Sequence, residues 1–139
     1  MEFKLEVVVI PVTDVDRAKA FYADGCGFHV DVDQELSPEF RVVQLTPPGS
    51  GCSVTFGKGM AAMEPGTLKG VQLCVADIDA AQALYAARGV PVTPVRHHDG
   101  TGFVDGRGDD WNSFFFFDDP DGNSWAVQES RKMRAAAAG

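Results

Sequence analysis

An internal repeat constrains the fold of this chain more than any other feature of its sequence. A strand-and-helix pattern that begins near Val8 returns 63 positions later at Val71, with matching apolar, acidic and aromatic residues. The matched pairs are Val8 and Val71, Val12 and Val75, Asp14 and Asp77, Asp16 and Asp79, Ala18 and Ala81, Ala20 and Ala83, and Tyr22 and Tyr85. A hairpin also repeats, 71 positions on, with Gly51 and Ser53 matching Gly122 and Ser124. Such a repeat predicts two copies of one structural unit.

The first half predicts one βαβββ unit. A strand at 7–13 precedes a helix at 15–26, for which Asp14 or Asp16 supplies the N-cap. Pro11 indicates that the strand lies at a sheet edge or contains a bulge, because proline donates no hydrogen bond to a neighbouring strand. The other predicted strands are 28–32, 41–46 and 52–57, with a polar connection at 33–39.

The second half predicts the same unit with a longer connection. A strand at 70–76 and a helix at 78–88 are followed by a proline-interrupted edge strand at 90–95. Residues 96–112 form a long loop rich in glycine and aspartate, and a hairpin at 113–129 closes the unit. The hairpin turn is specified by three residues, Asp119, Pro120 and Gly122.

These patterns together predict an α+β fold built from tandem βαβββ modules. One module alone covers only one face of a small sheet, so we expect the two to form a curved mixed sheet, a cup, with helices on its outer face. The predicted domain spans 4–130, with repeats at 4–57 and 70–130, a linker at 58–69 and a tail at 131–139.

Composition excludes several classes of function. The formal net charge is −8, and an acidic chain repels phosphate, so neither nucleic acid nor an anionic membrane is an expected partner. No run of about 18 apolar residues is present. The first residues carry acids and show no signal-peptide pattern, and the three cysteines show no C-x-x-C spacing. We therefore expect a cytoplasmic protein with free thiols.

Strand alternation sorts the side chains between the helix-covered face and the cup. Ser53 and Thr55 in the first half, and Ser124, Ala126 and Gln128 in the second, are expected in the cup. The hairpin repeat matches Gln44 with Phe115 and Thr46 with Phe117. This match predicts that Phe115 and Phe117 face the cup, whereas Phe114 and Phe116 join the core.

The sequence resembles the vicinal oxygen chelate superfamily, which includes glyoxalase I, bleomycin-resistance proteins and extradiol dioxygenases. Three segments carry the resemblance, which covers about residues 4–130: VVVIPVTDVDRAKAFY, GVQLCVADIDAAQALY and DDPDGNSWAVQE. The resemblance implies paired βαβββ modules whose sheet forms a cup, and a homodimer.

The resemblance also implies where a metal would bind. Glyoxalase-like members hold a divalent ion with His or Glu from four strands, and the matching positions are Val7, Thr55, Gly70 and Ala126. Only Thr55 carries a side-chain oxygen, and a divalent ion needs several imidazole or carboxylate donors. We therefore expect no metal at the family position, and no cofactor.

The resemblance and the predicted cup favour a protein that binds a small apolar or aromatic molecule without a metal. The expected ligand-binding residues come from strands and from the 96–112 loop, which we predict to be a lid. They are Gln44, Thr55, Gln72, Trp111, Phe115, Phe117 and Gln128.

Two enzymatic alternatives remain open at this point. In one, a metal-independent lyase, isomerase or hydrolase uses His97 or His98 as general acid or base, with Arg107 or Arg41 holding an anion. In the other, a glyoxalase- or dioxygenase-type metalloenzyme builds a different site around His97, His98 and Asp99. Adjacent histidines on extended backbone point in opposite directions, which disfavours the second alternative.

Overall fold

The computed structural model describes residues 1–60, 62–131 and 133. They form two compact units, and we describe each by itself. The first unit comprises residues 1–68 together with 119–123, and the second comprises 69–118 and the residues from 124 onward. Most of the tail predicted at 131–139 lies outside the described residues, as does position 61 of the predicted linker. No helix among the described residues is long and apolar enough to cross a membrane.

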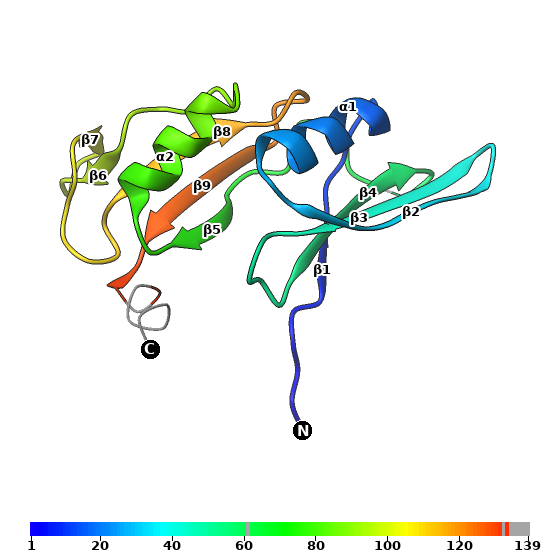
Figure 1. Cartoon of the computed structure of the whole chain (residues 1–139), viewed down its shortest axis with the longest axis horizontal. Coiled ribbons are helices and arrows are strands. Elements are labelled where there is room, and N and C mark those ends of the chain that lie inside the picture. Colours follow the sequence, from blue (N-terminus) through cyan, green and yellow to red (C-terminus); the bar gives the residue numbers. More distant parts are fainter. Residues whose placement is uncertain (61, 132, 134–139) are drawn as a thin grey trace. The chain divides into compact units, whose positions relative to one another are not determined.

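The first unit contains a four-stranded sheet in the order β1-β4-β3-β2 and one helical segment (Figure 1). Strands β1 and β4 run parallel, whereas the other neighbours are antiparallel. The elements are β1 (Val7–Val9), α1 (Val15–Ala20), the π-helical turn η1 (Phe21–Gly25), β2 (His29–Ser37), β3 (Phe40–Thr46) and β4 (Ser53–Lys58).

The second unit repeats this arrangement and adds a strand. Its sheet has the order β5-β9-β8-β6-β7, again with one parallel pair, β5 and β9 (Figure 1). The elements are β5 (Val71–Val75), α2 (Ile78–Ala87), β6 (Arg96–His98), β7 (Phe103–Asp105), β8 (Phe114–Asp118) and β9 (Ser124–Glu129). The predicted α+β class with two tandem modules is thus confirmed.

Two predicted connections are strands instead. Residues 33–37, expected as a polar connection, continue β2 opposite β3, because an exposed edge strand tolerates polar side chains on both faces. The 96–112 segment, expected as a long loop, contains the antiparallel pair β6 and β7. The predicted edge strand at 90–95 is reduced to an isolated bridge between Val92 and Phe117.

Each helix begins after an aspartate that caps it, Asp14 or Asp77, and covers one face of its sheet. The Asp14 carboxylate accepts from the Arg17 amide at 3.0 Å, and Asp77 accepts from the Ala80 amide at 3.1 Å. In the first unit the fully buried Tyr22 ring lies 5.8 Å from the rings of both Phe28 and Phe56. In the second, the Tyr85 ring on α2 contacts Phe115 and Phe117 of β8.

The turn at 119–123 holds a buried polar network within the first unit. The Asp119 carboxylate accepts from the Tyr22 hydroxyl at 2.7 Å, from the Asn123 side-chain amide at 2.8 Å, and from the Asp121 and Asn123 backbone amides at 2.9 Å. Asn123 also donates to the Pro11 carbonyl at 2.8 Å, and its side-chain oxygen accepts from the Leu68 amide at 3.2 Å. Asp119 and Asn123 are 5% and 0% exposed. Their polar atoms are satisfied by one another and by three separate stretches of the first unit.

We predict that Asn123→Ala destabilises the protein by about 2–4 kcal/mol, because it leaves buried partners of the amide unsatisfied. Urea unfolding at neutral pH measures the change. The matched control is Asp118→Ala, which removes an exposed side chain one residue before the turn and should change stability by less than about 0.5 kcal/mol. Equal losses in the two variants would contradict a special role for the network.

Candidate functional site

The four consecutive phenylalanines of β8 face the opposite way from the prediction. Phe115 and Phe117 are 0% and 3% exposed and contact Tyr85, so they belong to the core under α2. Phe114 and Phe116 therefore lie on the other face of the sheet. The predicted direction fails because the two hairpins differ by one residue. Gln44 pairs with Thr55 eleven positions on, whereas Phe116 pairs with Ala126 only ten positions on.

Phe103, Phe114 and Phe116 together form a surface that we call the aromatic face. The rings of Phe114 and Phe116 stack with an interplanar angle of 7° and a centroid distance of 6.1 Å. The Phe103 ring meets both edge-on, at 5.5 and 5.0 Å, and remains 47% exposed. Phe103 is therefore the exposed member of the group, and Phe114 and Phe116 are partly buried beside it.

A pair of amides adjoins the aromatic face. Gln72 on β5 donates to the Gln128 side-chain oxygen at 2.6 Å, and Gln128 donates to the Trp111 carbonyl at 2.6 Å. Gln128 lies directly opposite Phe114 in the sheet. The structure therefore brings together three of the predicted ligand-binding residues, Gln72, Trp111 and Gln128, beside phenylalanines that the prediction assigned to the core.

Trp111 has a backbone conformation that bulky residues rarely adopt. Its φ is 65°, the only positive φ among the described non-glycine residues. The Asn112 amide donates to the Asp109 carbonyl at 2.9 Å, so Trp111 lies at the third position of a tight turn, where glycine is usual. Its side chain is nevertheless 49% exposed. The turn thus holds a large aromatic side chain at the surface at a cost in backbone strain.

In the first unit the structure places Gln44 and Thr55 opposite one another on β3 and β4. The Thr55 hydroxyl is buried and donates to the Val43 carbonyl at 2.9 Å. These two predicted ligand-binding residues are therefore neighbours, but the Thr55 hydroxyl proton is already used by the backbone.

His97 and His98, in the segment predicted to be a lid, have separate partners and do not form a common site. His97 bonds through Nδ1 to the Gly106 carbonyl at 3.0 Å, whereas His98 accepts from the Gly100 amide at 3.1 Å and contacts Phe103 edge-on. They lie on opposite faces of β6 because successive residues of a strand alternate. Asp99 accepts from Thr101 and Gly102, and these bonds lower the pKa of its carboxyl to about 2. The Asp99 carboxylate therefore stabilises the turn between β6 and β7.

The arginines considered as anion holders are bound to carboxylates. Arg107 contacts Asp79 and the buried Glu129, each at 2.6 Å. The second Glu129 oxygen accepts from the Ile78 amide at the start of α2 at 2.9 Å. Arg41 donates to both oxygens of Asp33 at 3.0 Å and to Asp16 at 2.9 Å. Both guanidinium groups are thus held in structural ion pairs.

The residues at the implied metal positions do not fit a divalent ion. Val7, Gly70 and Ala126 carry no donor atom, and the Thr55 hydroxyl is bonded to the backbone. Among the described residues, no group of three His, Cys, Asp or Glu side chains is arranged to hold a metal ion. Cys74 on β5 lies opposite Gln128 of β9, and burial raises the pKa of its thiol.

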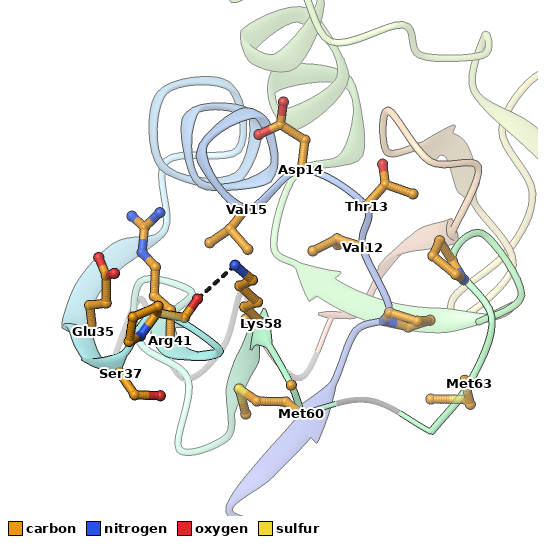
Figure 2. A pocket seen from close by; sticks show the side chains of 15 residues that line it. Val12, Thr13, Asp14, Val15, Glu35, Ser37, Arg41, Lys58, Met60 and Met63 are labelled. Atoms are coloured by element: carbon orange, nitrogen blue, oxygen red, sulfur yellow. Dashed lines mark hydrogen bonds between the residues drawn. The ribbon is translucent and has the colours of Figure 1, made fainter.

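The first unit contains a pocket of about 650 Å³ that none of the predicted ligand-binding residues lines (Figure 2). It lies among the loop after β1, the start of α1, the ends of β2 and β4, and residues up to Pro65. Lys58 within it donates to the Pro38 carbonyl at 2.6 Å, and Arg41 is held by its carboxylates. Its remaining lining is mixed: Val12, Val15, Met60 and Met63 are apolar, whereas Thr13, Asp14, Glu35 and Ser37 are polar (Figure 2).

Comparison with known proteins accounts for this arrangement of two modules. A family model described as the Glyoxalase/Bleomycin resistance protein/Dioxygenase superfamily matches residues 4–127. The chain belongs to this superfamily. None of the curated proteins matches the sequence significantly.

Several solved structures are similar over almost the whole chain. TnmS3, an antibiotic binding protein from Streptomyces sp. CB03234, is 30% identical with a TM-score of 0.74, over 93% of this chain and 97% of that one. A glyoxalase/bleomycin resistance protein from the same organism is 31% identical with a TM-score of 0.70, over 90% and 99%. A superfamily member from Sphaerobacter thermophilus DSM 20745 is 29% identical with a TM-score of 0.73, over 93% and 98%.

The charges beside the pocket predict an acid-sensitive contribution to stability. Hydrogen bonds from Arg41 and Lys19 lower the pKa of the Asp33 carboxyl from 3.8 to about 2. A carboxyl with a lower pKa in the folded protein stabilises it above pH 4 and loses this effect as the pH falls toward 2. Asp33→Asn should therefore lower stability at pH 7 by less than about 1 kcal/mol and flatten the decline between pH 4 and 2.

Urea unfolding of both proteins across this pH range measures the difference. Gln34→Ala, on the next residue of β2, changes no charge and should keep the slope of the unaltered protein. A slope that is the same in Asp33→Asn as in Gln34→Ala would contradict the assignment to Asp33.

Proposed function

We propose that this superfamily member binds a small apolar or aromatic molecule on the aromatic face of its second unit, without a metal ion. The observation that carries the proposal is the cluster of Phe103, Phe114 and Phe116, in which the 47% exposed Phe103 contacts two partly buried rings. The paired amides of Gln72 and Gln128 supply hydrogen-bonding groups beside it. Pockets for small molecules commonly combine apolar and aromatic walls with a few polar groups.

Two further observations support the proposal. The residues at Val7, Thr55, Gly70 and Ala126 offer no imidazole or carboxylate, which supports binding without a metal. One relative of 30% identity is described as an antibiotic binding protein, which supports a drug-like ligand for this chain. The histidines and arginines considered for catalysis are used in turns and ion pairs, so the geometry favours binding over metal-independent catalysis.

The proposal predicts that Phe116→Ala weakens ligand binding about tenfold, because it removes one of three mutually contacting rings of the aromatic face. The probe is 1-anilinonaphthalene-8-sulfonate, followed by its fluorescence, with a panel of aromatic antibiotics tested by thermal shift. Each affinity is measured without EDTA, with EDTA, and with a divalent ion added back. The matched control is Leu84→Ala, which removes a half-exposed apolar side chain from α2 and should leave affinity unchanged.

A third variant distinguishes the two candidate surfaces. Met60→Ala alters the pocket of the first unit and should not affect binding. If Met60→Ala weakens binding and Phe116→Ala does not, the ligand lies in the pocket and the aromatic face is the wrong site. Binding that disappears in EDTA and returns with a divalent ion would contradict metal independence.

A further inference from the structure

The pocket of the first unit lies on the face of the sheet that packs against the helical segment. Lys58 shares this face with Phe56 of β4, because side chains two positions apart in a strand point the same way. Phe56 is fully buried and contacts Tyr22 of η1. Thr55, which was predicted to line the cup, therefore points to the opposite face. The pocket is thus a different site from the predicted cup, and it shares no residue with the aromatic face.

A row of three charged residues crosses the sheet at this pocket. Arg41 of β3 lies between Glu35 of β2 and Lys58 of β4, directly opposite each in the strand register, and all three line the pocket. Ion pairs with Asp33 at 3.0 Å and Asp16 at 2.9 Å neutralise the Arg41 guanidinium. The row therefore offers a ligand one carboxylate and one ammonium, on strands that are about 10 Å apart.

Neither of these two charges is paired within the part of the chain that the structure describes. The Glu35 carboxylate forms no hydrogen bond or ion pair with a described residue, and Lys58 forms one hydrogen bond there, to the Pro38 carbonyl at 2.6 Å. An ammonium group has three donors, so those of Lys58 are not exhausted. The remaining polar side chains of the pocket have partners within the unit, namely Thr13, Asp14, Ser37 and Arg41.

Apolar side chains form the walls between these charges. Val12 and Val15 come from the loop after β1 and the start of α1, and Met60 and Met63 follow β4. Figure 2 shows the two valines above Lys58 and the two methionines below it. Methionine side chains are unbranched and flexible, so they pack against apolar groups of varied shape. A cavity of about 650 Å³ with such walls has the size of a small-molecule site.

We propose that this pocket binds a short apolar peptide of two or three residues with free ends. The N-terminal ammonium of the peptide pairs with Glu35, its C-terminal carboxylate pairs with Lys58, and its side chains pack against the valines and methionines. An extended di- or tripeptide spans about 7–11 Å, which matches the spacing of about 10 Å between β2 and β4. This ligand is distinct from the molecule proposed for the aromatic face.

The two charges disfavour simpler ligands. A molecule with only a negative charge meets the Glu35 carboxylate, and a molecule with only a positive charge meets the Lys58 ammonium, so each leaves one charge of the pocket without a partner. Among the described contacts, Glu35 and Lys58 do not form an ion pair with each other. Their separation favours a ligand whose charges are farther apart than the roughly 3 Å of a single amino acid.

Isothermal titration calorimetry with the dipeptide Leu-Val tests the proposal. Both charged groups of the pocket are exposed, so the expected Kd is about 0.1–1 mM. N-acetylated Leu-Val and Leu-Val amide each lack one charge and should bind at least about threefold more weakly. Equal affinity of the free and blocked peptides overturns the proposal, as does the absence of binding at about 10 mM peptide.

Two variants assign the two ends of the peptide. Glu35→Gln should abolish the effect of acetylation and keep that of amidation, whereas Lys58→Met should do the reverse, because each variant removes one of two independent partners. The matched controls are Glu39→Gln and Lys4→Met, which remove exposed charges outside the pocket and should keep both effects. Variants at 35 and 58 that also keep both effects overturn the proposal.

A further pair of variants separates this site from the aromatic face. Met60→Ala should weaken Leu-Val binding at least about threefold, because it removes part of an apolar wall. Phe116→Ala should leave Leu-Val binding unchanged. The opposite result places the peptide on the aromatic face and overturns the proposal. Because the fluorescent probe of the aromatic face is measured separately, failure of either site is distinguished from failure of the other.

Discussion

The buried carboxylate of Asp119 organises the first unit. It accepts four hydrogen bonds, two from backbone amides of its own turn and two from the side chains of Tyr22 and Asn123. The Tyr22 ring that it holds is the centre of the core formed with Phe28 and Phe56. A turn distant in sequence thereby fixes the π-helical turn η1, and Asn123 extends the same network to the loop after β1. The buried charge is tolerated because each of its lone pairs has a donor.

The aromatic face depends on a difference of one residue between two hairpins. Because side chains alternate along a strand, removing one residue from the second turn exchanges the faces of all four phenylalanines of β8. Phe115 and Phe117 then pack against Tyr85. Phe114 and Phe116 lie on the opposite face, where Phe103 partly covers them. Phe103 lies on β7, the edge strand of the sheet, and β6 is the single strand between β7 and β8. The aromatic face therefore combines two rings from β8 with one ring from β7.

The repeat made the fold predictable, whereas the site depended on features without a sequence signal. Matching apolar and acidic positions sufficed to predict two modules, both helices and their caps, because these follow from local spacing. The face of β8 could not be derived from FFFF, which shows no alternation, and the repeat misled because turn length was assumed equal. The β6–β7 pair was missed because RHH and FVD are too short for a periodic pattern. The predicted cytoplasmic location and the domain boundaries stay predictions.

The turn that holds Trp111 keeps a large aromatic side chain at the surface, where the proposed binding of an aromatic molecule could use it. A left-handed conformation costs a non-glycine residue about 1–3 kcal/mol, and a glycine at this position would avoid the cost. The bond from Gln128 to the Trp111 carbonyl offsets part of it and links the turn to the paired amides of the sheet. A glycine would lose the exposed indole while keeping the backbone carbonyl that Gln128 contacts. The backbone strain at Trp111 keeps one aromatic side chain exposed in the same unit as the aromatic face. This arrangement agrees with the proposed binding of an aromatic molecule by stacking and amide hydrogen bonds.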